Sequence, residues 1–167
     1  LGVVAGAALG AALGSRAMHL LQVPSWTLAH LSDPAYMFQG KSIVGGLLGG
    51  HAGVVAAKRL LGLTRSTGDL FVLPLLVAIS IGRVGCFLAG LADGTYGSAT
   101  SLPWAVNLGD GIPRHPTQLY EILWLGAIGL SIARFREPLR MPGMAFQALM
   151  AAYLAFRFVV EFIKPWP

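Results

Sequence analysis

Residues 78–97 read Ala78-Ile-Ser-Ile-Gly-Arg83-Val-Gly-Cys86-Phe-Leu-Ala-Gly-Leu-Ala-Asp93-Gly-Thr-Tyr96-Gly97 and place one arginine inside a run typical of a lipid-embedded helix. On insertion scales, a guanidinium at the centre of a membrane span costs at least about 2.5 to 3.5 kcal/mol. We therefore expect Arg83 to face the interior of a helix bundle or a wet cavity and to have a function there. Arg16, Arg157 and Glu161 interrupt apolar runs in the same way.

The composition predicts a membrane protein. Of the 167 residues, 55% are hydrophobic and only 11% are charged, which is far from the balance of a soluble domain. Crossing about 30 Å of hydrocarbon takes about 20 mostly apolar residues, and five segments meet this need: 1–21, 43–61, 70–91, 118–133 and 143–163. We expect an all-α, polytopic membrane helix bundle that forms a single domain over 1–167, with a small extracytoplasmic cap at 92–114.

The beginning of the chain suggests a piece of a longer protein. The first residue is Leu1, and the first apolar segment starts without any flanking polar residues. We expect further spans beyond this sequence.

The distribution of basic residues predicts which loops are cytoplasmic. The net charge is +5, which in a soluble protein could indicate nucleic-acid binding, but here the positive residues gather in two short loops, which favours a membrane topology. They are Lys58, Arg59 and Arg65 in one loop and Arg134, Arg136 and Arg140 in the other. By the positive-inside rule these two loops are cytoplasmic.

This topology brings the unusual polar residues to one depth. Arg16, Arg83, Arg157 and Glu161 fall in the outer half of the membrane, level with Arg114, His115 and Glu121 and with the glycines at 45–46. Independent structural roles would scatter such residues over both leaflets. We therefore expect one arginine-rich cavity at the outer leaflet that binds an anionic phospholipid headgroup.

No metal or other cofactor is expected. A single cysteine, Cys86, excludes an internal disulfide and any multi-cysteine metal site. The four histidines show no metal-ligand spacing; they are His19, His30, His51 and His115. Cys86 and His51 are most simply read as small buried and hydrogen-bonded interior residues.

Glycines recur every four residues in the first two segments, at Gly2, Gly6, Gly10 and Gly14 and again at Gly45, Gly49 and Gly53. Small residues at this spacing let two helices approach closely. The doubled Gly45-Gly46 leaves a second interpretation open, in which bare backbone N–H groups bind a ligand.

Two further segments carry candidate groups. Pro116 suits the first position of a helix, so the helix start beside Arg114 and His115 forms either an anion site or a capped start with a solvated pair. Tyr153, Arg157 and Glu161 share one stripe of a helix, where Arg157 and Glu161 can form an ion pair that offsets part of their burial cost.

The loops have their own signatures. Trp26, Tyr36 and Phe38 fit an interfacial aromatic belt, and Trp166 marks the outer interface at the end of the chain. Asp33-Pro34 resembles the start of a short interfacial helix, and residues 102–111 predict a short hairpin over the outer end of the bundle.

Four motifs resemble, in order and spacing, the signature segments of the prolipoprotein diacylglyceryl transferases. They are Ser42-Ile-Val-Gly-Gly-Leu-Leu-Gly-Gly, Gly82-Arg-Val-Gly-Cys-Phe-Leu-Ala-Gly, Arg114-His-Pro-Thr-Gln-Leu-Tyr-Glu and Tyr153-Leu-Ala-Phe-Arg-Phe-Val-Val-Glu-Phe. The resemblance covers nearly the whole chain. It implies a protein of about seven spans, of which the first and last are absent here, in the bacterial cytoplasmic (inner) membrane with its site toward the extracytoplasmic face.

The resemblance also implies a reaction and a set of partners. The diacylglyceryl group of phosphatidylglycerol would pass to the lipobox cysteine of a prolipoprotein, with release of glycerol 1-phosphate and with no nucleic acid involved. The implied catalytic residues are Arg83, Arg157, Glu161, His115 and Glu121. The implied substrate-binding residues are Arg83, Tyr153, Arg114, Gln118, Gly45, Gly46, Cys86, Gly97 and Arg16.

Two positions depart from the family pattern. Val44 stands where many members have a histidine that has been considered a base, and Cys86 stands where many have asparagine. The base is therefore open among His115, Glu121 and Glu161. A related lipid transferase with another acceptor, and a non-catalytic lipid-binding or transport protein, remain alternatives, although no internal repeat of the transporter kind is visible.

Overall fold

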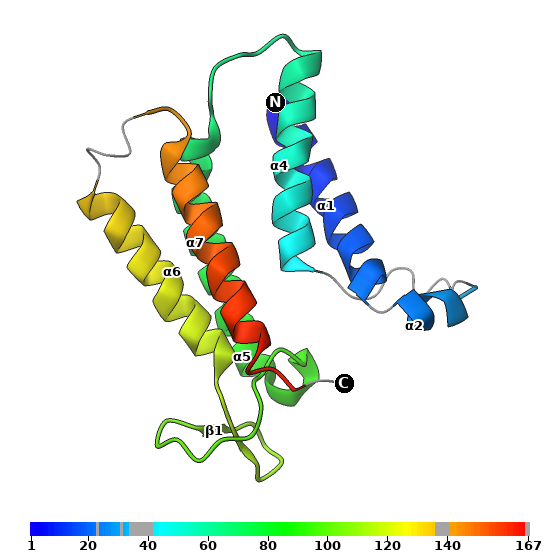
Figure 1. Cartoon of the computed structure of the whole chain (residues 1–167), viewed down its shortest axis with the longest axis vertical. Helices are drawn as coiled ribbons and strands as arrows, with labels where there is room; N and C mark the ends of the chain where they lie inside the picture. The colour runs from blue at the N-terminus through cyan, green and yellow to red at the C-terminus, as the bar shows by residue number, and fades with distance from the viewer. Residues whose placement is uncertain (23, 31, 34–41, 136–140, 166–167) are drawn as a thin grey trace. The chain divides into compact units, whose positions relative to one another are not determined.

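The structure is a computed structural model that describes residues 1–22, 24–30, 32–33, 42–135 and 141–165 (Figure 1). The described chain is mostly helical, as predicted for an all-α membrane bundle. It forms two compact units, Leu1–Arg65 and Ser66–Pro167.

The first unit is built on two long helices that lie side by side, α1 (Gly2–Gln22) and α4 (Ile43–Leu60), with the short helix α2 (Pro24–Ala29) after α1. Ser42 is the N-cap of α4, and its hydroxyl accepts a hydrogen bond of 3.3 Å from the Gly45 N–H. Serine is favoured at this position because its side chain satisfies one of the free N–H groups of the first turn.

Backbone contact between glycines holds α1 against α4. A Cβ placed on Gly6 would come within 2.7 Å of the Gly53 carbonyl oxygen, and Gly10 and Gly14 lie equally tightly against Gly49 and Gly45. Only hydrogen fits at these positions. The packing interpretation of the glycine repeat is therefore confirmed.

The alternative interpretation of Gly45-Gly46 requires two bare backbone N–H groups, and in the structure both are hydrogen-bonded. The Gly45 N–H donates to the Ser42 hydroxyl, and the Gly46 N–H donates to the Ser42 carbonyl at 2.9 Å. Neither N–H is bare for a ligand, because the cap of α4 already uses both.

The second unit contains α5 (Val72–Ala89), α6 (Thr117–Arg134) and α7 (Met144–Glu161), with 3₁₀ turns at Gly68–Phe71 (η1) and Gly90–Asp93 (η2). A two-stranded antiparallel hairpin, β1 (Val106–Asn107) and β2 (Pro113–Arg114), lies at the end where α5 and α7 finish and α6 begins (Figure 1). The register pairs Val106 with Arg114 and Asn107 with Pro113. The hairpin predicted in this region is present.

Asp69 links the start of α5 to the start of α7, at the end of the unit away from the hairpin. Its carboxylate accepts hydrogen bonds from the N–H of Gly143 at 2.6 Å and of Phe146 at 3.1 Å, at the start of α7. A carboxylate at a helix N-terminus satisfies free N–H groups and complements the helix dipole. This contact sets the relative height of α5 and α7 within the unit.

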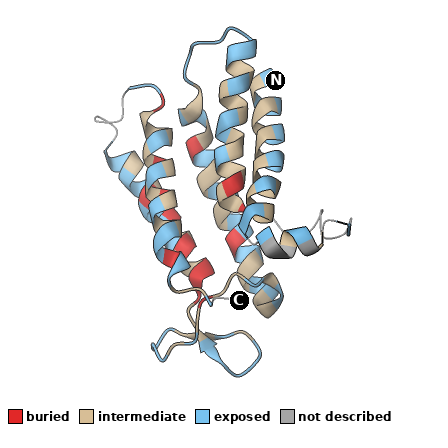
Figure 2. Cartoon of the chain, turned by 45° about the vertical axis from the view of Figure 1, so that its right-hand side comes forward, coloured by how far each residue is buried: buried red, intermediate tan, exposed pale blue. Residues whose placement is uncertain are grey.

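Most buried side chains of the second unit's helices lie on α6 and α7. Leu125, Ile128, Leu149, Tyr153 and Val160 form the apolar part of this core. Figure 2 shows the buried positions spread along these helices toward the hairpin end. Several of the buried residues are polar, and they make up the site described below.

The expected segments agree with the helices to within about two residues, apart from the 3₁₀ turns that extend the third. Among the described helices, Gly2–Gln22, Gly68–Asp93 and Met144–Glu161 are long and apolar enough to cross a membrane. The other two segments form α4 and α6, whose polar residues lower their mean hydropathy. Pro116 lies at the N-cap of α6 and not at its first helical position.

Some expectations fall outside the described residues. These are the Tyr36 and Phe38 part of the aromatic belt, the side chain of Trp26, the helix start at Pro34, the loop arginines Arg136 and Arg140, and Trp166. The short helix α2 was not expected. The single-domain organisation and the extracytoplasmic cap stay predictions.

We predict that Gly49→Ala destabilises the full-length protein by about 1 to 3 kcal/mol, because its new methyl group meets the α1 backbone. Gly46→Ala is the matched control, since the nearest atom to a Cβ there is 3.7 Å away. Both changes gain the same helix propensity, so the difference between their unfolding free energies in detergent measures the contact. Equal stabilities would contradict the close approach.

Candidate functional site

Glu121 is the centre of the buried polar cluster in the second unit. It lies in the second turn of α6 and is 1% exposed. Its Oε1 accepts a hydrogen bond of 2.6 Å from the Tyr153 hydroxyl, and its Oε2 accepts one of 3.0 Å from Arg157 Nη1. Arg83 Nε lies 2.9 Å from Oε1. One carboxylate therefore joins α5, α6 and α7.

The chain directions explain why these residues meet. α5 and α7 both run toward the hairpin, whereas α6 starts there and runs away (Figure 1). Residues late in α5 and α7 therefore lie level with residues early in α6. The expectation that Arg83, Arg157 and Glu121 share one depth is confirmed within this unit by their contacts.

Immediately around Glu121, positive charge exceeds negative charge. Two guanidiniums share one carboxylate, and their side chains are 9% and 13% exposed. Arg83 Nε is near Glu121 but is not aligned for a hydrogen bond, and no described group accepts from the buried Nε of Arg157. Since an arginine carries five N–H donors in a planar fork, donors remain that suit an anion with several oxygens.

Thr95 connects this cluster to the start of α6. Its hydroxyl accepts hydrogen bonds of 3.4 Å from Arg83 Nη1 and from Gln118 Nε2, and it donates to the carboxylate of Asp93. Its carbonyl accepts from the Thr117 hydroxyl at 2.5 Å. The sequence analysis missed Thr95 and Thr117, because residues in a loop and at the start of a helix have no periodicity that would single them out.

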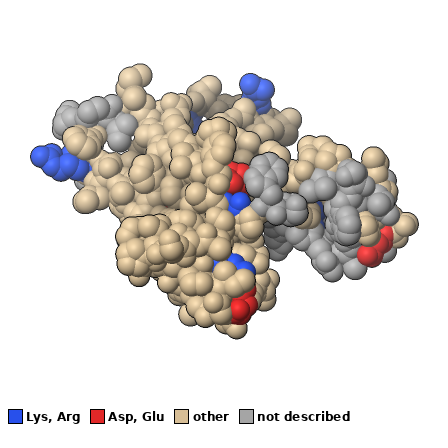
Figure 3. Space-filling model, turned by 60° about the horizontal axis from the view of Figure 1, so that its bottom comes forward, with Lys and Arg blue, Asp and Glu red and all other residues tan. Residues whose placement is uncertain are grey.

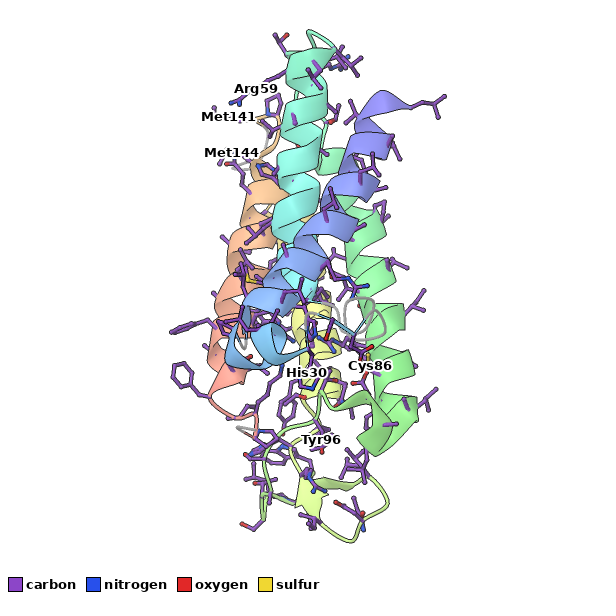
Figure 4. All side chains as sticks on the ribbon, turned by 90° about the vertical axis from the view of Figure 1, so that its right-hand side faces the viewer. His30, Arg59, Cys86, Tyr96, Met141 and Met144 are labelled. Carbon is purple, nitrogen blue, oxygen red and sulfur yellow. The ribbon has the colours of Figure 1, made fainter. Side chains whose placement is uncertain are left out.

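Cys86 lies one turn after Arg83, and its Sγ is 3.8 Å from Arg83 Nη1. It is partly exposed and free. Figure 4 shows Cys86 and Tyr96 near the hairpin end of the unit, with Met144 at the far end. Cys86 thus borders the arginine cluster, as its place in the expected site requires.

His115 and Gly97 pack together beside the cluster. The Gly97 N–H donates to the His115 carbonyl at 2.9 Å, and a Cβ on Gly97 would lie only 2.5 Å from the His115 Cβ. His115 Nδ1 is 3.1 Å from the hydroxyl of Tyr120, which also accepts from Trp104 Nε1 at 2.8 Å. Gly97 therefore lets the loop reach His115, which is bound to an aromatic hydroxyl.

Arg114 is engaged within the hairpin. Its Nη1 lies 2.6 Å from an oxygen of Asp110, and its guanidinium stacks 5.0 Å from the Tyr96 ring centre. The hydrogen bond from Arg114 holds the pKa of Asp110 below its usual value. Figure 3, which looks toward this end, shows charged atoms only as small patches on an uncharged surface. The structure therefore shows Arg114 paired with an acid and not with His115.

The ion pair that the helical spacing allows between Arg157 and Glu161 does not form in the structure. Arg157 pairs with Glu121, whereas the Glu161 side chain is 61% exposed and lies 3.6 Å from Lys164 Nζ. Glu161 is the last residue of α7, so its side chain has already left the packed part of the helix. Burial of the Lys164 amine, with Arg157 nearby, lowers its pKa.

The remaining expected residues belong to the first unit. Arg16, Gly45 and Gly46 lie on α1 and α4, and their share in the site stays a prediction.

We predict that Glu121→Gln lowers the unfolding free energy of the full-length protein by about 3 to 5 kcal/mol, because it leaves two buried guanidiniums without their counter-charge. The matched control is Glu161→Gln, which alters a largely exposed carboxylate and should change stability by no more than about 0.5 kcal/mol. Denaturant titration in detergent measures both. Similar losses in the two variants would mean that Glu121 does not hold the cluster together.

The chain is similar in sequence to known proteins of one family. A sequence family described as prolipoprotein diacylglyceryl transferase matches residues 2–166. Three similar relatives, each named phosphatidylglycerol–prolipoprotein diacylglyceryl transferase, come from Nitratidesulfovibrio vulgaris (37% identity, 93% of this chain and 60% of the relative), Geobacter sulfurreducens (35%, 97% and 64%) and Bordetella parapertussis (34%, 93% and 61%). No solved structure matches significantly. The chain spans about three fifths of the length of these relatives, and it belongs to the prolipoprotein diacylglyceryl transferase family.

Proposed function

We propose that the full-length protein transfers the diacylglyceryl group of phosphatidylglycerol to the thiol of a prolipoprotein cysteine. One observation carries this assignment beyond the names of the relatives: Arg83 and Arg157 converge from two helices on one buried carboxylate. Buried cations arranged in this way suit a lipid phosphate, because arginine binds phosphate oxygens in a forked, bidentate geometry.

The reaction needs help at its leaving group. A bond forms between the cysteine sulfur and the terminal glyceryl carbon, the bond from that carbon to the phosphate oxygen breaks, and glycerol 1-phosphate departs with the electron pair. The thiol proton passes to a base of the protein as the sulfur attacks, since the thiolate is the nucleophile. Cations that are already in place around the phosphate stabilise the charge that develops there.

In this proposal Arg83 and Arg157 bind the phosphate, and Glu121 positions them. Glu121 Oε1 accepts from Tyr153, its Oε2 accepts from Arg157, and Arg83 adjoins it. A carboxylate with its lone pairs engaged in this way is a poor proton acceptor. His115 and Glu161 thus remain the candidates for the base, and Tyr153 serves mainly to orient Glu121.

We further propose that the hairpin end of the second unit faces the extracytoplasmic side of the bacterial inner membrane. Arg134 is the last residue of α6, at the end away from the hairpin. Arg136 and Arg140 follow it in the sequence. Basic residues concentrate in cytoplasmic loops. The arginine cluster then lies where lipid and a translocated prolipoprotein can both reach it.

We predict that full-length protein, incubated with phosphatidylglycerol and a lipobox peptide, increases the peptide mass by one diacylglyceryl group. Arg83→Ala should lower this rate by at least about 100-fold, as expected for loss of a group that stabilises developing charge. Arg134→Ala, which changes an exposed arginine beside Phe135, is the matched control and should keep the full rate. Mass spectrometry of the peptide measures both.

Two results would overturn the assignment. Full activity in a folded Arg83→Ala protein would remove the arginine cluster from the mechanism. Consumption of phosphatidylglycerol by the wild-type protein without labelling of the peptide would identify another acceptor.

A further inference from the structure

Gln118 has a buried acceptor that nothing in the described structure satisfies. Gln118 is 1% exposed, and among the described residues its Oε1 has no hydrogen-bond partner. Buried carbonyl oxygens usually find a donor, and an unsatisfied one is unfavourable. A buried amide oxygen kept in this state inside a polar cluster suggests that a ligand supplies the donor.

The neighbouring hydroxyl determines which atom of the amide stays unsatisfied. A threonine hydroxyl has one proton and two acceptor positions. Thr95 gives its proton to Asp93, which is an acceptor when ionised, and it accepts from Arg83 Nη1 and Gln118 Nε2. All its capacity is therefore used, and it can only accept from Gln118. The amide must turn its NH₂ toward Thr95, which leaves Oε1 as the unpaired atom.

The same hydroxyl joins the Gln118 amide to the proposed phosphate site. Gln118 Nε2 and Arg83 Nη1 each lie 3.4 Å from Thr95 Oγ1, so these two nitrogens are separated by no more than two hydrogen-bond lengths. A phosphate held by Arg83 would bring the groups attached to that phosphate close to Gln118.

We infer that Gln118 Oε1 accepts a hydrogen bond from a hydroxyl of the lipid headgroup and so selects a glycerol headgroup over one without hydroxyls. This inference rests on the proposed function. Phosphate and ester oxygens carry no proton at neutral pH, whereas the terminal glycerol of phosphatidylglycerol has two hydroxyl donors within a few bonds of the phosphate. Asp93 and Thr95 are positioning residues that hold the amide in the required orientation.

The test compares phosphatidylglycerol with phosphatidylpropanol of the same acyl chains, which has the same charge but lacks the headgroup hydroxyls. Wild-type full-length protein should prefer phosphatidylglycerol by about 10-fold or more in diacylglyceryl transfer, since sites built to bind a hydroxyl discriminate against analogues that lack it. Gln118→Leu should lose this preference, because its rate falls much further with phosphatidylglycerol than with phosphatidylpropanol. Gln147→Leu, at an exposed glutamine of α7, is the matched control and should keep the preference.

A second pair of variants separates positioning from folding. Thr95→Val removes the hydroxyl that orients the amide and should also abolish the preference, whereas Thr95→Ser should restore it. A folded Gln118→Leu protein that keeps the wild-type preference would overturn the inference, and so would equal losses with both lipids. If Gln118→Leu does not fold, a Thr95→Val protein that keeps the preference would overturn it.

Lipid binding distinguishes this inference from the proposed function. If wild-type protein forms no thioether with either lipid, the transferase assignment fails. The relative retention of the two lipids by wild type and Gln118→Leu in native mass spectrometry then still tests the hydroxyl contact. Equal retention of both lipids by wild type would overturn it.

Discussion

The contact between the Glu121 carboxylate and two arginines is the interaction on which the second unit depends. Neither Arg83 nor Arg157 could lie inside an apolar bundle alone, because a buried charge without a partner is strongly unfavourable. Glu121 receives both, together with the Tyr153 hydroxyl. The position of α6 between the ends of α5 and α7 follows from this shared partner as much as from apolar packing.

The two units hold their helices together by different physical means. α1 and α4 approach through glycines until backbone touches backbone, which gives close packing between the two helices. Lipid tails are as apolar as the side chains, so burying apolar surface between helices gives little driving force in a membrane. Close van der Waals contact is then an effective source of helix association. α5, α6 and α7 are instead joined by charged and hydrogen-bonded groups, and this arrangement provides donors that can bind a phosphate.

The polar cluster extends further than the charges alone suggest. The Thr95 hydroxyl is hydrogen-bonded to Arg83, Gln118 and Asp93. The Thr117 hydroxyl donates a hydrogen bond to the Thr95 carbonyl. A loop after α5 is thus bound to the first turn of α6. This arrangement makes the orientation of a neutral amide depend on the same network that holds the arginine, which links phosphate binding to recognition of the rest of the headgroup.

Much of this protein was determined by its sequence alone. Apolar runs of span length and glycines every four residues predicted the helices and their capacity for close packing, because each depends on local composition and period. The distribution of basic residues among the loops predicted that Arg83 and Arg157 lie at one depth. Only the tertiary structure decided which acid the arginines share. Glu161 had the right helical spacing to Arg157, but it lies at the exposed end of α7, whereas Glu121 comes from another helix at the same depth. Pairing across helices depends on the rotation and height of each helix, and neither is encoded in the spacing of residues along one chain segment. Thr95 was hidden for the same reason, since a loop residue acquires its partners only when the elements around it are assembled.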